Sequence, residues 1–140
     1  MGEPTKIQWL SEPEDKDYPA AQSYLSLLHP EAEAASLVKK LREAKVTQFK
    51  SKDIFRASGL SLLGDSNYHV GKDQQKIKDG KSLSPLLLVR NSSNGKVVIA
   101  DGYHRICASW HWDEKCPVAC CVADLQSDRQ ENSAKPHSRP

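Results

Sequence analysis

The sequence predicts a mixed α/β domain of the α+β kind, in which helices flank a sheet and a helical hairpin comes first. Three observations carry this prediction. The chain has 140 residues, a length typical of one domain. Apolar residues recur with helical spacing in the N-terminal half, and continuous apolar runs typical of buried strands occupy the C-terminal half. The expected order is helix, helix, strand, short helix, helix, strand, strand, helix, strand.

The charge of the chain is nearly balanced, because 20 Lys and Arg residues and 18 Asp and Glu residues leave a formal net charge of +2. A polybasic nucleic-acid-binding arm or an acidic tail would carry a large excess of one sign, so both classes are excluded. No apolar run approaches the roughly 18 residues of a membrane-spanning helix. The N-terminus lacks the pattern of a signal peptide. We therefore expect a cytoplasmic protein with no membrane partner.

Three segments of different character divide the chain. Residues 1–18 are polar and acidic, and we expect an irregular lead-in that Trp9 and Leu10 tack onto the domain. Residues 19–124 carry all the periodic patterns and are expected to form the single domain. Residues 125–140 contain almost no apolar side chain, which predicts a disordered tail.

A helical hairpin is predicted over residues 19–44. Pro19 opens the first helix, and Pro30 suits the first position of the second. Glu31 near the start of the second helix and Arg42 near its end complement the helix dipole. Each helix has one apolar face, and the two faces comprise Ala21, Tyr24, Leu25 and Leu28, then Ala34, Leu37, Val38 and Leu41.

The segment after the hairpin is typical of a short strand followed by two helices. Residues 46–50 alternate apolar and polar side chains, as a strand does. Ser51 or Asp53 suits the cap of a short helix that Gly59 ends. A polar helix follows over residues 70–79, and because it has few apolar anchors we expect it at the surface.

Two apolar runs joined by a turn predict a β-hairpin next. Residues 86–89 are continuously apolar, as expected of a strand buried on both faces. Asn94 and Gly95 form a strong turn signal, and residues 97–99 supply the partner strand.

A helix and a last strand complete the predicted domain. Asp101 is the expected cap of a helix over residues 102–112. Pro117 begins the last strand. Three side chains on one side of that strand are expected to share a face: Val118, Cys120 and Val122.

Four cysteines lie in the last quarter of the chain. Their spacing lacks the paired Cys-x-x-Cys of a zinc site, so a zinc site completed by His111 is only a weak alternative. Adjacent cysteines in a strand would point to opposite faces. We interpret all four as small buried hydrophobic side chains: Cys107, Cys116, Cys120 and Cys121.

The run Asp101-Gly102-Tyr103-His104-Arg105 lies where a buried strand ends and a helix begins. A helix N-terminus exposes unpaired backbone N–H groups and carries a positive partial charge. Gly102 would allow another molecule to approach the backbone, while His104 and Arg105 add donors that suit phosphate. The spacing alone leaves a second interpretation open, in which Asp101 caps an ordinary helix and Arg105 makes a surface ion pair.

The negative charge of Asp101 would lie close to a bound phosphate. Arg105, protonated His104 or a bridging Mg²⁺ would have to offset it. A functional Asp101 therefore favours a metal–nucleotide, with Asp101 as the Mg²⁺ ligand or as the base that activates an acceptor hydroxyl. His104 is the second candidate catalytic residue.

Three runs of the C-terminal half form a recognisable series: Leu83-Ser84-Pro85-Leu86-Leu87-Leu88-Val89-Arg90, Ile99-Ala100-Asp101-Gly102-Tyr103-His104-Arg105-Ile106-Cys107-Ala108 and Cys116-Pro117-Val118. With them the chain resembles the ParB/sulfiredoxin superfamily over about residues 60–124. In that superfamily a Pro-led buried strand precedes a Gly-x-x-Arg-x-x-x-Ala-type turn and helix, and a strand beginning at Pro-Val follows. Within it the chain resembles a group of small bacterial proteins that carry the Asp-Gly-Tyr-His-Arg stretch.

The resemblance implies a ParB/sulfiredoxin-like mixed sheet that binds a nucleotide. ParB proteins use the turn for CTP, sulfiredoxins use it for ATP, and a free-serine kinase shares the fold. This chain is thus expected to bind ATP or CTP with Mg²⁺ and to act as a phosphotransferase or NTPase. The residues implied to hold the phosphate are Gly102, Tyr103, His104 and Arg105.

Tyr103 marks the main departure from the superfamily. Sulfiredoxins have their nucleophilic cysteine at this position, and Cys107 lies one helical turn further on, so we do not expect sulfinate repair. ParB sites have an acid at the position of Tyr103 and an arginine at that of His104. A polar tail follows where ParB proteins have a helix-turn-helix, so DNA is a less expected partner than a nucleotide.

Four further residues are second-tier candidates for the same site. In the superfamily, the segment before the buried strand faces the nucleotide, which implies roles for His69, Lys72 and Asp73. His69 is equally typical of a capping or surface histidine. Arg56 follows Asp53 by one helical turn and either pairs with it or lines the same cleft.

The alternative function is a non-catalytic interaction module. From Lys39 to Arg56, seven basic residues outnumber two acidic ones. This surface could bind a nucleic acid or a protein partner, or it could be the solvated face of a helix. A homodimer is also consistent with the sequence, and a toxin–antitoxin or immunity-type partner stays open.

Overall fold

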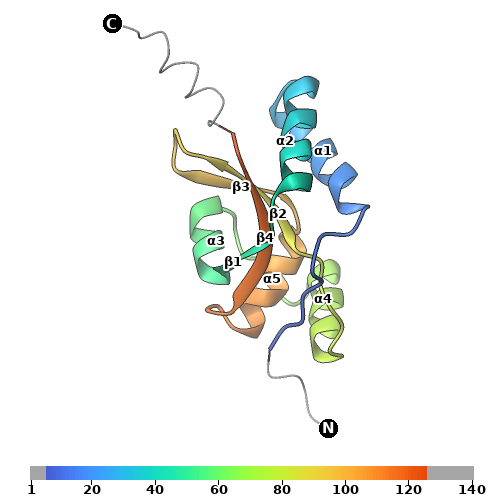
Figure 1. Cartoon of the computed structure of the whole chain (residues 1–140). Helices are drawn as coiled ribbons and strands as arrows, with labels where there is room; N and C mark the ends of the chain where they lie inside the picture. The colour runs from blue at the N-terminus through green and yellow to red at the C-terminus, as the bar shows by residue number, and fades with distance from the viewer. Residues whose placement is uncertain (1–5, 126–140) are drawn as a thin grey trace, which may run out of the picture.

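The structure, a computed structural model, describes residues 6–125 and has the predicted order of elements (Figure 1). The α+β class is therefore confirmed. The nine elements are α1 (Asp17–Leu28), α2 (Glu31–Glu43), β1 (Thr47–Lys50), α3 (Ser51–Ser58), α4 (Tyr68–Lys78), β2 (Leu86–Asn91), β3 (Lys96–Asp101), α5 (Tyr103–Trp112) and β4 (Pro117–Asp124).

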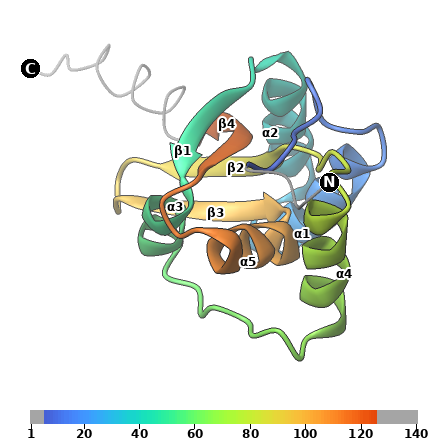
Figure 2. The same ribbon diagram turned by 90° about the horizontal axis from the view of Figure 1, so that it is seen from below.

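The four strands form one mixed sheet in the order β1-β4-β2-β3 (Figure 2). β2 and β3 are antiparallel and form the predicted hairpin, and β1 is antiparallel to β4. β4 and β2 are parallel. β4, the last strand of the described residues, therefore lies in the interior of the sheet.

Two hydrophobic clusters lie on opposite faces of this sheet. The α1–α2 hairpin covers one face, and α3, α4 and α5 contribute to the other; Figure 1 shows the hairpin and α3 on opposite sides of the strands. Side chains of β4 alternate between the clusters, as the period of a strand requires. Val118, Cys120 and Val122 face the α3–α5 side as predicted, while Cys121 and Ala123 face the hairpin.

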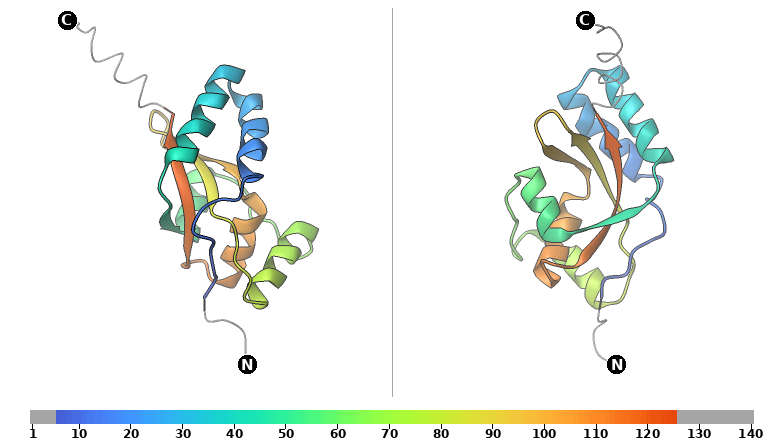
Figure 3. Two further views of the ribbon diagram at one scale, coloured as in Figure 1. Left: turned by 45° about the vertical axis from the view of Figure 1, so that its right-hand side comes forward. Right: turned by 60° about the vertical axis from the view of Figure 1, so that its left-hand side comes forward.

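The lead-in is tied to the domain through backbone pairing. Trp9 forms a parallel bridge with Leu83, and the N–H of Leu10 donates to the carbonyl of Leu83 over 2.8 Å. Ile7 is buried in the core beneath this bridge. Figure 3 shows the lead-in running beside the segment that precedes β2. Trp9 and Leu10 thus attach the lead-in as expected, whereas the predicted tail lies almost entirely outside the described residues.

The start of every helix departs from the sequence prediction. Pro30 takes the cap position of α2 and not its first helical position, and the start of α5 is described with the site below. α1 begins at Asp17, before Pro19. α4 begins at Tyr68 because the side chain of Asn67 accepts hydrogen bonds from the backbone N–H groups of His69 and Val70. Neither predicted cap starts α3, since Lys50 occupies the cap position without a side-chain hydrogen bond.

Helix ends agree better with prediction. Gly59 ends α3 in a left-handed conformation with φ of 69°, as expected of a C-terminal glycine.

The helices are short, and α2 is the longest described helix at 13 residues. Across residues 6–125, no helix combines the length and apolar character needed to cross a membrane.

All four cysteines are free and buried, in agreement with their interpretation as core residues. Burial raises the pKa of Cys116 to about 11 and that of Cys120 to about 12, so both thiols stay protonated at neutral pH. Within the described residues, no three His, Cys, Asp or Glu side chains are grouped so that they could hold a metal ion. The weak zinc alternative therefore has no support from the geometry.

Candidate functional site

The start of α5 is built differently from the prediction. Gly102, not Asp101, occupies the cap position, and α5 has no side-chain cap. Asp101 is still part of β3, opposite Leu87, where the pairing slips by one residue as in a β-bulge. The backbone N–H groups at the start of α5 are therefore free of a capping side chain.

Gly102 is required by internal packing. Its φ is +109°, a backbone conformation that side-chain-bearing residues rarely adopt. A Cβ at this position would lie 2.7 Å from Leu86 Cγ and 3.0 Å from Arg105 Nη2. The side of Gly102 on which a Cβ would stand is thus filled by the protein itself, while Gly102 still lines the cleft described below.

Arg105 lies beneath the turn, inside a network of carboxylates. Its Nη2 donates to Asp101 Oδ2 over 2.9 Å and makes a longer contact of 3.5 Å with the carbonyl of Pro85. Its Nη1 lies 3.9 Å from Asp17 Oδ1. The Arg105 side chain is only 17% exposed. The ion-pair interpretation is therefore right about Asp101 and Arg105, but the pair is largely buried rather than on the surface.

Asp17 also belongs to this network, and the sequence analysis did not predict it. Ser84 Oγ donates to its carboxylate, and the backbone N–H of Glu14 donates to the same oxygen over 2.9 Å. Burial raises the pKa of Asp101, the charge of Asp17 adds to that rise, and Arg105 opposes it. Two carboxylates and one guanidinium thus lie together under the turn.

A polar stripe on α4 faces the start of α5. His69, Lys72, Asp73 and Lys76 follow the i, i+3, i+4, i+7 spacing of one helix face. Together with residues 101–105 they line a cleft of about 170 Å³. The structure therefore brings three of the second-tier candidates to the predicted phosphate-binding turn.

Lys76 was missed because the sequence prediction stopped at Asp73. The helical spacing from His69 contains the signal that would have found it, since Lys76 is one turn beyond Lys72 on the same face. Arg56 is different, because it is exposed on α3 and is not among the residues that line this cleft.

Two imidazoles meet across the cleft. The ring centroids of His69 and His104 lie 4.8 Å apart. Burial lowers the pKa of His104, the charges of His69 and Arg105 lower it further, and Asp73 opposes them. His104 is therefore neutral at pH 7, in contrast to the protonated form considered from the sequence.

Tyr103 is among the residues that line the cleft, and its hydroxyl is engaged by a neighbouring loop. The hydroxyl donates to the carbonyl of Ser61 over 2.6 Å and so holds the loop between α3 and α4 against the start of α5. The same loop is held a second time by His111, whose Nε2 lies 2.9 Å from the carbonyl of Leu63. Any contact of Tyr103 with phosphate would thus use its N–H group.

The donor set fits a protein-held Mg²⁺ poorly. Asp101 is the one residue predicted to ligate it, and Asp101 Oδ2 is hydrogen-bonded to Arg105. In residues 6–125 no cluster of three candidate ligands exists. Because Mg²⁺ prefers an octahedral shell of oxygen ligands, most of its ligands here would have to be water or phosphate oxygens.

Comparison of this chain with protein-family models, with curated proteins and with solved structures finds no match.

Proposed function

We propose that this protein binds the phosphate group of a nucleotide in the cleft between α4 and the start of α5. One observation carries the proposal: the polar stripe of α4, with Lys72 and Lys76, faces the uncapped N-terminus of α5. A helix N-terminus and two ammonium groups both favour an anion. The resemblance of the Asp101–Arg105 run to a nucleotide-binding superfamily supports the same ligand.

Each polar side chain of the cleft has a separate role in this proposal. Lys72 and Lys76 neutralise the phosphate, and the first N–H groups of α5 donate to its oxygens. His104 donates one further hydrogen bond as a neutral imidazole. Arg105, which also lines the cleft, holds Asp101 in place and offsets its charge.

The size of the cleft indicates how a nucleotide would lie. A volume of about 170 Å³ is below the roughly 300 to 1,000 Å³ of pockets that enclose drug-sized ligands. The terminal phosphates would enter while the nucleoside stays outside, as in ATP or CTP bound by their phosphates. His104 could then accept a proton from water or an acceptor hydroxyl, which makes phosphoryl transfer or hydrolysis the reaction class.

We place the protein in the cytoplasm, where buried thiols stay reduced.

Isothermal titration with ATP, CTP, GTP and ADP, with and without Mg²⁺, tests the proposal. We expect binding by the wild type that weakens about tenfold or more in the K72Q/K76Q double variant, because charge-assisted contacts are lost. Lys78→Gln is the matched control, since Lys78 lies on the same helix and lines a different hollow. Absence of heat with every nucleotide, or equal weakening by the control, would contradict the proposal.

A protein-interaction module remains the second candidate, and one observation favours it. Three apolar side chains of α1 are exposed: Tyr24, Leu27, which is 82% exposed, and Leu28. The apolar side chains of α1 that face the sheet, such as Ala21 and Leu25, are buried. Exposed apolar side chains at i, i+3 and i+4 suit a protein partner or a second copy of this chain. If the partner is a second copy of this chain, light scattering should show a dimer for the wild type and a monomer for Leu27→Asp. If the partner is another protein, a pull-down should recover it with the wild type and lose it with Leu27→Asp.

A further inference from the structure

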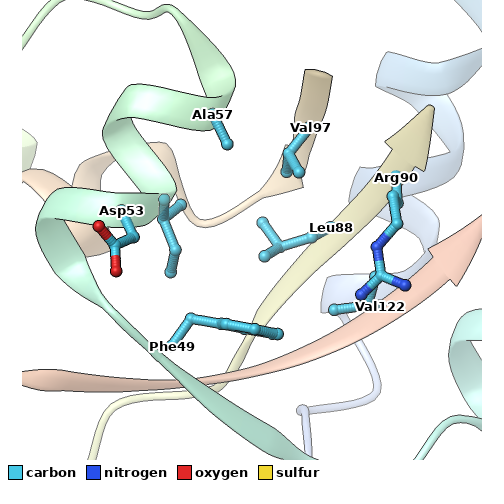
Figure 4. Close-up of a pocket in the computed structure, with 8 residues that line it drawn as sticks. Phe49, Asp53, Ala57, Leu88, Arg90, Val97 and Val122 are labelled. Atoms are coloured by element: carbon cyan, nitrogen blue, oxygen red, sulfur yellow. The ribbon is translucent and has the colours of Figure 1, made fainter. Parts of the chain in front are cut away.

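A second hollow, the apolar pocket, lies between α3 and the sheet (Figure 4). Its volume is about 200 Å³. It shares no residue with the cleft between α4 and residues 101–105, which we call the phosphate cleft after the ligand proposed for it. Side chains from all four strands reach it. Six apolar side chains line it: Phe49, Ile54, Ala57, Leu88, Val97 and Val122.

The pocket exists because α3 is too short to cover this end of the sheet. α3 has eight residues and ends at Gly59. Leu88 and Ile54 are buried, but Val97 and Val122 are only partly covered, and Phe49 is 43% exposed. Side chains of the hydrophobic core are thus left with one open side. An apolar group placed there would remove their surface from water, which is favourable.

Two opposite charges stand at the two ends of the pocket. Figure 4 shows Asp53 on the α3 side and Arg90 on the far side, with the apolar side chains between them. Arg90 Nη1 lies 3.2 Å from Asp124 Oδ1, and both side chains are more than 40% exposed. An exposed pair of this kind contributes little, and because a guanidinium has five N–H donors, Arg90 can bind a ligand carboxylate beside Asp124.

We propose that the apolar pocket binds a small carboxylate that carries one aromatic ring or one branched alkyl group. The volume suits one such group, since an engineered apolar cavity of roughly 150 Å³ takes up benzene. The carboxylate pairs with Arg90 and points away from Asp53, so only one orientation is favourable. A mainly apolar lining with a few polar groups at the rim is typical of small-molecule sites.

Amide NMR of the ¹⁵N-labelled protein with 3-phenylpropionate tests this site. We expect a dissociation constant on the order of 1 mM and shifts that centre on Ala57, Val97 and Val122. The neutral 3-phenylpropanamide and the cationic 3-phenylpropylamine should bind at least several-fold more weakly, because they cannot pair with Arg90. No shift of these amides at about 10 mM, or equal binding of all three compounds, would overturn the proposal.

Variants locate the binding within the pocket. Ala57→Leu should abolish the shifts by filling the space, and Arg90→Gln should weaken 3-phenylpropionate about fivefold or more while leaving the neutral amide unchanged. Arg56→Gln is the matched control, because Arg56 lies on α3 outside the pocket. Asp124→Asn should strengthen binding by releasing Arg90.

Two outcomes would reassign the pocket. Tighter binding of N-acetylphenylalaninamide than of 3-phenylpropionate would indicate a peptide side chain as the occupant and overturn the carboxylate assignment. Weakening by Arg56→Gln equal to that by Arg90→Gln would show that general surface charge, rather than the pocket, attracts the ligand. The phosphate cleft shares no residue with this site, so its titration with nucleotides is an independent result.

Discussion

The phosphate cleft contains an arginine–aspartate pair, the apolar pocket has another at its rim, and the two pairs differ in what surrounds them. Arg105 and Asp101 are less than one-fifth exposed and are joined by a second carboxylate, Asp17. Arg90 and Asp124 are nearly half exposed. Removing one member of a buried ion pair is costly because the other charge is left buried without a partner or solvent. Removing one member of an exposed pair changes stability little. The cleft is therefore a fixed part of the fold, and the rim of the pocket is free to exchange partners.

The largest effect is expected from Gly102→Ala at the cleft. The new Cβ would lie within 2.7 Å of Leu86 Cγ at a φ of +109°, so strain and crowding together should lower the free energy of unfolding by roughly 3 kcal/mol. Gly59→Ala near the pocket is the control, since its φ is +69° but no atom lies within 4 Å of the new Cβ. It should cost about 1 kcal/mol. Urea denaturation measures both, and equal losses would show that crowding at Gly102 is relieved elsewhere.

Asp17→Ala and Arg90→Gln together compare the surroundings of the two arginine–aspartate pairs. Asp17→Ala leaves the Ser84 hydroxyl and one side of Arg105 without an acceptor, while the N–H of Glu14 keeps only its 3.2 Å contact with Ser84 Oγ, and it should destabilise the protein by about 2 kcal/mol. Arg90→Gln breaks the exposed pair and should cost about 0.5 kcal/mol or less. Thermal or urea unfolding checks the ranking. A larger loss from Arg90→Gln would invert the comparison.

The smallest effect concerns pH. Because the pKa of His104 is lowered from 6.5, the unfolded chain takes up a proton before the folded protein does as the pH falls. Stability should therefore decline as the pH drops below about 6.5, and His104→Gln should remove part of that decline. Unfolding midpoints at several values between about pH 7.5 and 5 measure it. A wild type and a variant with the same slope would show that His104 does not contribute.

Much of the fold could be predicted because its patterns are local. The continuous apolar run that became β2, the alternation in β4 and the glycine that ends α3 each depend on neighbouring residues alone. The order of elements followed from them. The pairing order β1-β4-β2-β3 did not, since the register between distant strands is decided by tertiary packing.

The candidate site was predicted in part, and its errors have a common cause. Asp101 before a glycine is typical of a helix cap, but the pairing with β2 extends to this residue and turns its carboxylate toward Arg105. Asp17 meets Ser84 across 67 positions of sequence, which no local pattern can show. Lys76, by contrast, could have been found from helical spacing. Local rules thus pointed to the residues of the candidate site, and long-range contacts decided how its charges are paired.

The interior position of β4 has a consequence for how the chain folds during synthesis. β4 pairs with β1, about 70 positions earlier, and with β2, and it contributes to both hydrophobic clusters. Until it leaves the ribosome, β1 has no neighbour and neither core can close. Contacts of such long sequence separation also slow folding. The nascent chain therefore exposes the apolar residues of β2 until β4 has been synthesised, and during that interval it is most open to aggregation and to chaperone binding.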